Sequence, residues 1–181
     1  METLGFLELN SIAKGVEAAD RILKTAEIRL LYAKAVCPGK YNVMFSGEVS
    51  AVEAAMENGK KIGGANVVDA VVIPKIHPEV IQAVNAATIP DKVNAVGILE
   101  FFSITSAVRV ADVCVKAADI SLVDVRLGCG IGGKSFVTLT GGVSAVEEAV
   151  KCGVNSARDD GMLISSVVIP NPRKEVFDSL L

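Results

Sequence analysis

The sequence predicts an α+β fold made of two tandem copies of one β-α-β-β-α-β-α domain, each an antiparallel sheet flanked by helices. Two observations support this prediction. The second part of the 181-residue chain repeats the first. In both copies, segments with apolar residues at strand spacing and segments with apolar residues at helix spacing also follow one another in the same order. The repeat is far longer than the unit of a solenoid, so it indicates a domain duplication.

The duplication is visible as three aligned blocks. Residues 5–37 align without gaps with residues 97–129, "VMFSGEVSAVEAAM" (43–56) aligns with "VTLTGGVSAVEEAV" (137–150), and "VVIPKIHPEVI" (71–81) aligns with "VVIPNPRKEVF" (167–177). Identical pairs include Gly5/Gly97, Leu7/Leu99, Glu8/Glu100, Ser11/Ser103, Asp20/Asp112, Lys24/Lys116, Leu30/Leu122 and Cys37/Cys129. We therefore expect two domains, 1–90 and 95–181, joined by the polar stretch "TIPDKVN" (88–94).

Each copy reads as the same series of elements. Short apolar or alternating runs predict strands at 4–9, 28–36, 41–47 and 67–74, and at 96–101, 120–128, 135–141 and 163–170. Apolar residues recur at helical spacing in 11–26 and 103–118, and further helices are expected from 50 and 144 and after each last strand. This order defines the predicted domain.

Polar residues indicate where these helices begin. Ser11 and Ser103 are expected N-caps of the first helix in each copy. An S-x-x-E pattern predicts a capping box at the second helix, with Ser50 and Glu53 in the first copy and Ser144 and Glu147 in the second. Pro74 and Pro170 are expected to end the last strands.

The stretch "RLGCGIGGKSF" (126–136) matches the phosphate-loop pattern G-x-x-x-x-G-K-[ST]. A phosphate loop leads directly into a helix, whose N-terminus binds the anion. Here Lys134 and Ser135 are followed by the β-branched run "FVTLTGG", so we expect a β-hairpin instead. The equivalent loop "CPGKY" (37–41) cannot match the motif but keeps Gly-Lys. The Gly-Lys pair is therefore predicted to be a property of the domain.

Composition excludes several functions. The net charge is −3, aromatic residues make up 4% of the chain and there is no Trp, so a nucleic-acid partner is not expected. No apolar run reaches membrane-span length and the N-terminus lacks the features of a signal peptide, so we expect a cytoplasmic protein without a membrane partner. The high hydrophobic content, 51%, predicts that the excess apolar residues are buried in a core or in subunit interfaces. The four scattered cysteines are expected to be free thiols.

Taken together, the paired domains, the G-h-x-E start, the helix ending in Lys-x-Ala, the Gly-Lys hairpin, "SGEVSAVEAA" and the late "VIPxxxP" resemble the bacterial microcompartment shell domain. Two copies in one chain resemble the tandem-domain shell proteins, and among them the type found in propanediol-utilisation compartments. This resemblance covers nearly the whole chain. It implies a structural tile rather than an enzyme: a homotrimer that mimics a hexamer, tessellates with other shell proteins into a facet and surrounds encapsulated enzymes.

The resemblance also implies a central pore lined by the glycine-rich hairpin loops. It assigns to the pore wall Pro38, Gly39 and Lys40 of the first copy and Gly130, Ile131, Gly132, Gly133, Lys134 and Ser135 of the second. Backbone amides and lysines around an axis would favour anionic or polar metabolites. From the loop alone, a tight hairpin with solvated lysines is an equally good interpretation.

In the resembled family the helix-end lysine lies at the tile edge, near a late Pro-x-x-His or Arg segment. This implies edge contacts by Lys24, Lys116, Lys75, His77 and Arg173. His77 is the only histidine, so a multi-histidine metal site within one chain is excluded. The simpler interpretation is that His77 caps a helix or contacts a neighbour. Glu8 and Glu100 lie one in each copy and do not suggest an acid–base pair.

Some propanediol-type tandem shell proteins hold a [4Fe–4S] cluster on the three-fold axis, with one cysteine from each second-copy loop. In their pattern the cysteine follows Gly-Gly-Lys, where this chain has Ser135. Cys129 is the alternative ligand, and a cluster bound there would add electron transfer to the function. The opposing interpretation is that Cys129, which aligns with Cys37, is an ordinary buried thiol.

Two other functions remain as alternatives at this point. One is a ring-shaped sensor or carrier of small molecules with a ferredoxin-like core. The other is the nucleotide hydrolase that the G-x-x-x-x-G-K-S string suggests. A trimer that forms sheets favours the shell tile, a strict monomer excludes it, and ATP binding lost in Lys134→Ala would favour the hydrolase.

Overall fold

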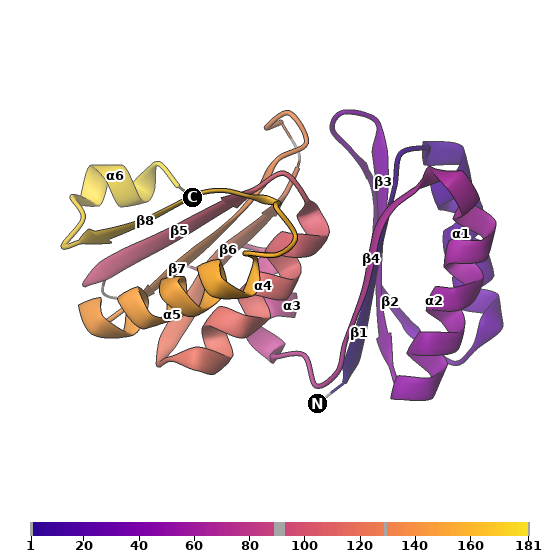
Figure 1. Cartoon of the computed structure of the whole chain (residues 1–181), viewed down its shortest axis with the longest axis horizontal. Coiled ribbons are helices and arrows are strands. Elements are labelled where there is room, and N and C mark those ends of the chain that lie inside the picture. Colours follow the sequence, from indigo (N-terminus) through magenta and orange to yellow (C-terminus); the bar gives the residue numbers. More distant parts are fainter. Residues whose placement is uncertain (1, 89–92, 129, 181) are drawn as a thin grey trace. The chain divides into compact units, whose positions relative to one another are not determined.

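A computed structural model of the chain describes residues 2–88, 93–128 and 130–180. Each half follows the order expected from the sequence (Figure 1). The first half contains β1 (Thr3–Leu9), α1 (Ile12–Thr25), β2 (Arg29–Val36), β3 (Lys40–Gly47), α2 (Val49–Gly63), the 3₁₀ turn η1 (Gly64–Asn66), β4 (Val67–Ile73) and α3 (Pro78–Asn85). The second half contains β5 (Ala95–Phe101), α4 (Ile104–Ala117), β6 (Ile120–Leu127), β7 (Ser135–Gly141), α5 (Val143–Ser156), β8 (Leu163–Pro170) and α6 (Lys174–Asp178).

The strands form two antiparallel sheets of identical topology. Their orders are β2-β3-β1-β4 and β6-β7-β5-β8, so the first strand of each half lies in the interior of its sheet. The registers also correspond, because Gly5 pairs with Phe45 as Gly97 pairs with Leu139. The edge strand β2 has a register shift between Leu30 and Tyr32. Its counterpart β6 has a register shift at the equivalent point, between Leu122 and Asp124. The predicted α+β class and tandem duplication are confirmed.

In the first half α1 and α2 cover one face of the sheet (Figure 1). The core between them and the sheet is formed by Leu7, Leu9, Ala18, Ala19, Ile22, Val43, Phe45, Val52, Ala55 and Met56. Gly15 of α1 allows a close approach to β3, because a Cβ placed there would lie 2.4 Å from the Cβ of Tyr41. Close packing of this kind leaves no room for one more methyl group.

In the second half α4 and α5 lie on one side of the sheet and α6 on the other (Figure 1). Gly97 of β5 faces α4 and α5, since a Cβ there would lie 2.8 Å from side-chain atoms of Leu139 and Val150. The opposite face carries a smaller cluster in which Phe177 of α6 packs with Val96 and Val123. Successive residues of β5 therefore point to opposite faces of the sheet, with Gly97 on the side of α4 and α5 and Val96 on the side of α6.

The helix starts confirm one prediction and correct another. The hydroxyls of Ser11 and Ser103 accept hydrogen bonds from the backbone amides of Lys14 and Ser106, at 3.3 and 3.2 Å, so both are N-caps. The capping boxes at Ser50/Glu53 and Ser144/Glu147 were wrong. The N-caps there are Glu48 and Gly142, whose extended backbone lets their carbonyls accept the first helical bond, and both serines lie inside the helix.

The chain divides into two compact units. One comprises Met1–Ile76 with Gly128–Gly133, and the other comprises His77–Leu127 with Lys134–Leu181. Helix α3 therefore packs with the second unit, although the duplication makes it the counterpart of α6. The domain boundaries 1–90 and 95–181 stay a prediction drawn from the repeat.

Candidate functional site

The first Gly-Lys loop is a tight connection between β2 and β3. It spans residues 37–39, and the amide of Gly39 donates to the carbonyl of Val36 at 2.9 Å. Gly39 has a φ of +103°, and a Cβ there would meet nothing within 4 Å. The backbone conformation, rather than crowding within the chain, therefore requires glycine at this point.

The second loop joins β6 to β7 and is longer. Gly128, Gly130, Gly132 and Gly133 all have positive φ, between +67° and +79°. A Cβ at Gly133 would lie 2.6 Å from Cδ of Pro38, so within the first compact unit Gly133 of this loop lies against the first loop. Cys129, the predicted alternative cluster ligand, lies outside the described residues.

The two loop lysines are held by glutamates of the same half. The Lys40 ammonium contacts Glu8 at 2.6 Å, and the Lys134 ammonium contacts Glu100 at 2.9 Å. Both glutamates lie on the first strand of their half. The Glu8 side chain is fully buried and that of Lys40 is 20% exposed, whereas the second pair is more open.

Sequence reasoning missed these ion pairs, although it identified all four residues. The partners of the first pair are 32 residues apart, and only the β1–β3 register brings them together. The available signal was that both the glutamate and the lysine recur in the second half at matching positions. A duplicated pair of opposite charges on neighbouring strands predicts an ion pair.

Ser135 occupies the position at which the resemblance would place a cluster cysteine. Its side chain is fully buried, and its hydroxyl donates to the carbonyl of Ser103 at 2.8 Å. The side chain thus points into its own half, so Ser135 does not fit the role of a metal ligand. The described residues contain no cluster of three or more His, Cys, Asp or Glu side chains suited to a metal ion.

Two of the described cysteines, Cys114 and Cys152, are poor candidates for thiolate ligands. Burial raises the pKa of the Cys114 thiol to about 12, and the thiol donates to the carbonyl of Ala149 at 3.2 Å. The pKa of Cys152 is also raised, by desolvation and then by its contact with Glu148. Raised thiol pKa values oppose the formation of the thiolate that binds metals. Cys37 is a free, half-buried thiol.

The phosphate-loop alternative fails on the local structure. Ser135 begins β7, and the next helix, α5, starts only at Val143. No helix N-terminus therefore follows the Gly-Lys pair, and the amides that would bind a phosphate are not supplied. The hairpin interpretation of "RLGCGIGGKSF" is confirmed.

The predicted edge residues fall into two different environments. Lys24 contacts Asp20 at 2.7 Å with both side chains well exposed, whereas Lys116 contacts a buried Asp112 at 2.5 Å. The amide of His77 donates to the other oxygen of Asp112 at 2.8 Å, which links the helix-end lysine to the late Pro-x-x-His segment. His77 is the N-cap of α3, although its side chain makes no capping bond.

Lys75 and Arg173 lie at the start of their late segments. Lys75 is exposed and has a φ of +54°, and Asn171, its counterpart, has a φ of +47°. Arg173 is exposed and is the N-cap of α6. Both copies therefore make the same turn after the proline, and the assignment of these residues to a tile edge stays a prediction.

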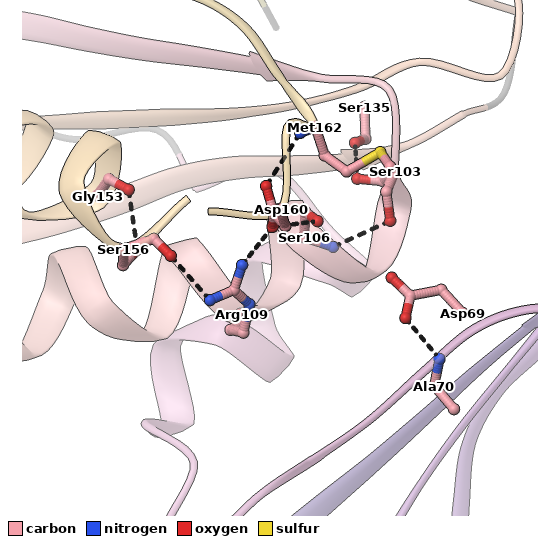
Figure 2. Close-up of polar contacts among 10 residues, drawn as sticks. All are labelled: Asp69, Ala70, Ser103, Ser106, Arg109, Ser135, Gly153, Ser156, Asp160 and Met162. Carbon is pink, nitrogen blue, oxygen red and sulfur yellow. Dashed lines mark hydrogen bonds and ion pairs between the residues drawn. The ribbon is translucent and has the colours of Figure 1, made fainter. Parts of the chain in front are cut away.

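A polar network joins α4 to the segment between α5 and β8 (Figure 2). Arg109 contacts the carboxylate of Asp160 and donates to the carbonyl of Ser156 at 3.0 Å. The hydroxyl of Ser106 and the amide of Met162 also donate to Asp160, each at 3.0 Å. These bonds fasten the α5–β8 connection to α4. The counterpart of Arg109 is Glu17, which pairs with Lys14 at the surface.

None of the helices in the described part of the chain is long and apolar enough to cross a membrane. The fold and the paired Gly-Lys hairpins define a tandem-domain protein of the microcompartment shell class. The BMC domain model matches residues 3–76 and 95–172, once in each half. The chain belongs to the bacterial microcompartment shell protein family, which makes it a structural shell protein and not an enzyme.

Individual relatives match this chain over nearly its whole length. The chain is 41% identical to the bacterial microcompartment shell protein PduT of Citrobacter freundii, over 99% of this chain and 98% of that protein. It is 26% identical to the carboxysome assembly protein CcmO of Synechococcus elongatus, over 98% of this chain and 68% of that one. A crystal structure of a microcompartment protein from Desulfitobacterium hafniense matches with a TM-score of 0.91 and 48% identity, covering 98% of this chain and 99% of that chain.

Proposed function

We propose that three copies of this shell protein form a ring-shaped tile with a central pore, and that such tiles tessellate with other shell proteins around encapsulated enzymes. The observation that carries the proposal is the common design of the two loops. In both halves the β-hairpin turn contains glycine with positive φ. The lysine that follows the turn forms an ion pair with a glutamate on the first strand of its half. Two loops of one design suit a six-part ring made from three chains.

The proposed pore wall consists of Pro38, Gly39 and Lys40 alternating with Gly130, Ile131, Gly132, Gly133 and Lys134. The close approach of Gly133 to Pro38 supports this order, because the two loops of one chain would be neighbours around the axis. We leave Ser135 out of the wall, since it is fully buried and bonded inside its own half.

Ion pairing changes the expected selectivity of the pore. Lys40 and Lys134 are each neutralised by a glutamate, so the loops offer backbone amides more than net positive charge. Backbone N–H groups replace part of the hydration shell of a polar solute without requiring a negative charge. Small polar metabolites, neutral or anionic, are the class that such a pore would pass.

We do not extend the proposal to electron transfer. Its ligand would be Cys129, which lies outside the described residues, and Ser135 points away from such a role. Anaerobic reconstitution with iron and sulfide, followed by visible absorbance of the wild type and of Cys129→Ser, decides whether a [4Fe–4S] cluster binds.

The assembly is tested by size exclusion with light scattering, followed by electron microscopy of concentrated protein. We expect a mass three times the 18.8 kDa of the chain, and flat sheets or tubes on overexpression. A protein that stays monomeric at all concentrations contradicts the proposal.

The axial position of the loops is tested by disulfide trapping. In a background with serine at the other accessible cysteines, Gly132→Cys should give oxidised dimers, because three thiols would meet near one axis. Gly161→Cys is a matched control, since both glycines have similar positive φ, +67° and +64°, and open space at the Cβ position. Equal dimer yields from both variants would contradict a pore at the Gly132 loop.

A further inference from the structure

The two loop lysines are paired in the same way, but their pairs differ in exposure to water. The Lys40 ammonium lies 2.6 Å from a carboxylate oxygen of Glu8, and the Lys134 ammonium lies 2.9 Å from one of Glu100. The side chains of Glu8 and Lys40 are 0% and 20% exposed, whereas those of Glu100 and Lys134 are 34% and 46% exposed. Water therefore reaches both partners of the second pair, but only the lysine of the first.

The strand neighbours of Glu8 strengthen the hold on Lys40. In the register of the first sheet Glu8 lies between Asn42 of β3 and Asp69 of β4, and Asn42 is fully buried. Side chains directly opposite each other on neighbouring strands are close together, so Asp69 brings a second carboxylate near Glu8. The positive charge of Lys40 offsets the repulsion between these two acids.

Glu100 has uncharged neighbours in the second sheet. It lies between Phe136 of β7, which is half-buried, and Ser165 of β8, which is exposed. Neither neighbour adds a carboxylate to the surroundings of Lys134. When Lys134 moves away, water solvates the Glu100 carboxylate in its place.

The ease with which each pair separates follows from these surroundings. Separation of Lys40 from Glu8 leaves a negative charge without its cation in a site that water does not reach, which is strongly unfavourable. Exposed pairs contribute little to stability, because water solvates both partners when they separate. Space beside the loops does not distinguish the two lysines, since a Cβ at Gly39 or at Gly132 would meet no described atom within 4 Å.

We infer that Lys134 is the residue of the proposed pore that binds anionic solutes, while Lys40 stays bound to Glu8 and only shapes the wall. The ligand is a small oxyanion, a carboxylate or a phosphate, whose negatively charged oxygen takes the place of the Glu100 carboxylate at the Lys134 ammonium. An ammonium group donates charge-assisted hydrogen bonds to oxygens of either class.

The inference rests on the proposed pore and names its solute-binding residue. In a trimer, three lysines would exchange their glutamates for a solute and three would not. The two halves of the chain would thus contribute unequally to a wall that they build from loops of one design.

Trace acetylation of the wild-type protein tests the difference between the two lysines. Acetic anhydride acetylates lysine amines, and mass spectrometry of the digested protein gives the extent of reaction at each lysine. Lys134 should react faster than Lys40. Inorganic phosphate at low ionic strength should slow the reaction of Lys134 and leave that of Lys40 unchanged. A parallel experiment with succinate distinguishes a carboxylate ligand from a phosphate.

Lys174 is the matched control for binding at any exposed lysine. Its pair with Asp178 is also exposed, and it lies on α6 rather than after a loop. Phosphate that protects Lys174 as strongly as Lys134 acts only by screening charge, and that result overturns the inference. Equal protection of Lys40 and Lys134 overturns it as well.

Two double variants measure the contribution of each pair to binding. Glu8→Gln with Lys40→Gln, and Glu100→Gln with Lys134→Gln, each replace one ion pair by two amides, so no buried charge is left alone. Calorimetric titration with inorganic phosphate should give a dissociation constant about tenfold higher, or more, for the second double variant, because a hydrogen bond to a charged group is lost. The first double variant should bind phosphate like the wild type. The single variant Glu100→Gln should bind it more tightly, because the competing carboxylate is removed.

The outcomes separate the inference from the function on which it rests. If the wild type is a monomer by light scattering, the proposed pore fails and the inference fails with it. If the wild type is a trimer whose Gly132 loops meet at the axis, but phosphate protects neither lysine, the pore stands and the inference is wrong. The acetylation experiment needs no variant, so it decides the question even if the first double variant does not fold.

Discussion

The two halves have the same fold but bury their equivalent surfaces to different extents. In α4 the residues Ile104 and Val108 are inaccessible, whereas in α1 their counterparts Ile12 and Val16 are about half exposed. The hydrophobic pattern along each helix is nearly the same, so the pattern alone does not decide which face is covered. An apolar stripe that is buried in one copy of a duplicated domain and exposed to solvent in the other is typical of a surface that binds a partner.

The largest expected effect compares the two leucines of the edge strands. Leu122→Ala should lower the free energy of unfolding by about 2–5 kcal/mol, because it leaves a cavity in a buried site. Leu30→Ala should cost the single chain much less, since Leu30 is 38% exposed. Thermal unfolding at several protein concentrations checks this. The Leu122→Ala loss should exceed the Leu30→Ala loss at every concentration, because only Leu122 is buried within its own chain.

The next effect compares the packing of the first helix with the hairpin strand. Gly15→Ala should destabilise the chain by about 1–3 kcal/mol, because the new methyl group would overlap Tyr41. The second half has Ala107 and Ser135 at the corresponding positions, an alanine opposite a smaller residue. Urea denaturation of Gly15→Ala, Tyr41→Ser and the double variant measures the coupling. If Gly15→Ala costs as much in the Tyr41→Ser background, the overlap is not its cause.

An effect of intermediate size is the pH dependence of the free energy of unfolding that Cys114 causes and its counterpart Ile22 does not. Burial raises the pKa of Cys114 to about 12, while in the unfolded chain the thiol titrates at its ordinary value near 8.5. The folded state therefore keeps a proton that the unfolded state loses. Its stabilising effect is complete below about pH 8.5 and is lost as the pH rises to about 12, at about 1.4 kcal/mol per pH unit.

The comparison with Cys114→Val isolates this thiol from other groups that titrate at high pH. The difference in free energy of unfolding between wild type and variant should be constant near neutrality and should shift in favour of the variant above about pH 8.5. Parallel curves for the two proteins up to pH 11 would show that the Cys114 thiol does not titrate differently in the folded state.

The smallest effect compares two ion pairs at equivalent places on α1 and α4. Arg109→Met removes the contacts with Asp160 and the Ser156 carbonyl, and we expect a loss of about 1 kcal/mol because the pair is partly exposed. Glu17→Met removes only an exposed pair with Lys14 and should cost no more than about 0.5 kcal/mol. Hydrogen exchange of the α5–β8 connection should increase in Arg109→Met alone. Equal losses in the two variants would contradict a fastening role for Arg109.

Most of the fold followed from the sequence because duplication tests every assignment twice. The element order, both hairpins and the N-caps Ser11 and Ser103 were predicted correctly. The capping boxes were not, because Ser50 and Ser144 lie one residue inside helices that begin at Val49 and Val143. A serine near a helix start satisfies the S-x-x-E pattern whether or not its own backbone is extended.

The site was less predictable because its contacts depend on register and docking. Lys40 and Glu8 are brought together by the pairing of β1 with β3, which a linear pattern does not specify. The bond from His77 to Asp112 joins residues 35 apart through the packing of α3. Sequence similarity between the halves marked Asp20 and Asp112 equally. Only the folded chain shows that Asp112 is buried and bonded to His77, whereas Asp20 is exposed.

The close contact between Gly15 and Tyr41 limits how the two halves can exchange genetic material. Recombination between the repeats that copied the segment around Ala107 into the first half, while leaving Tyr41 in place, would put a methyl group where the tyrosine packs. Copying the strand segment around Tyr41 into the second half, while leaving Ala107 in place, would put a tyrosine where Ser135 is buried. Either hybrid would lose stability, so the helix and the hairpin strand of each half are expected to be inherited together. An exchange of only one of the two segments between the repeats is therefore disfavoured.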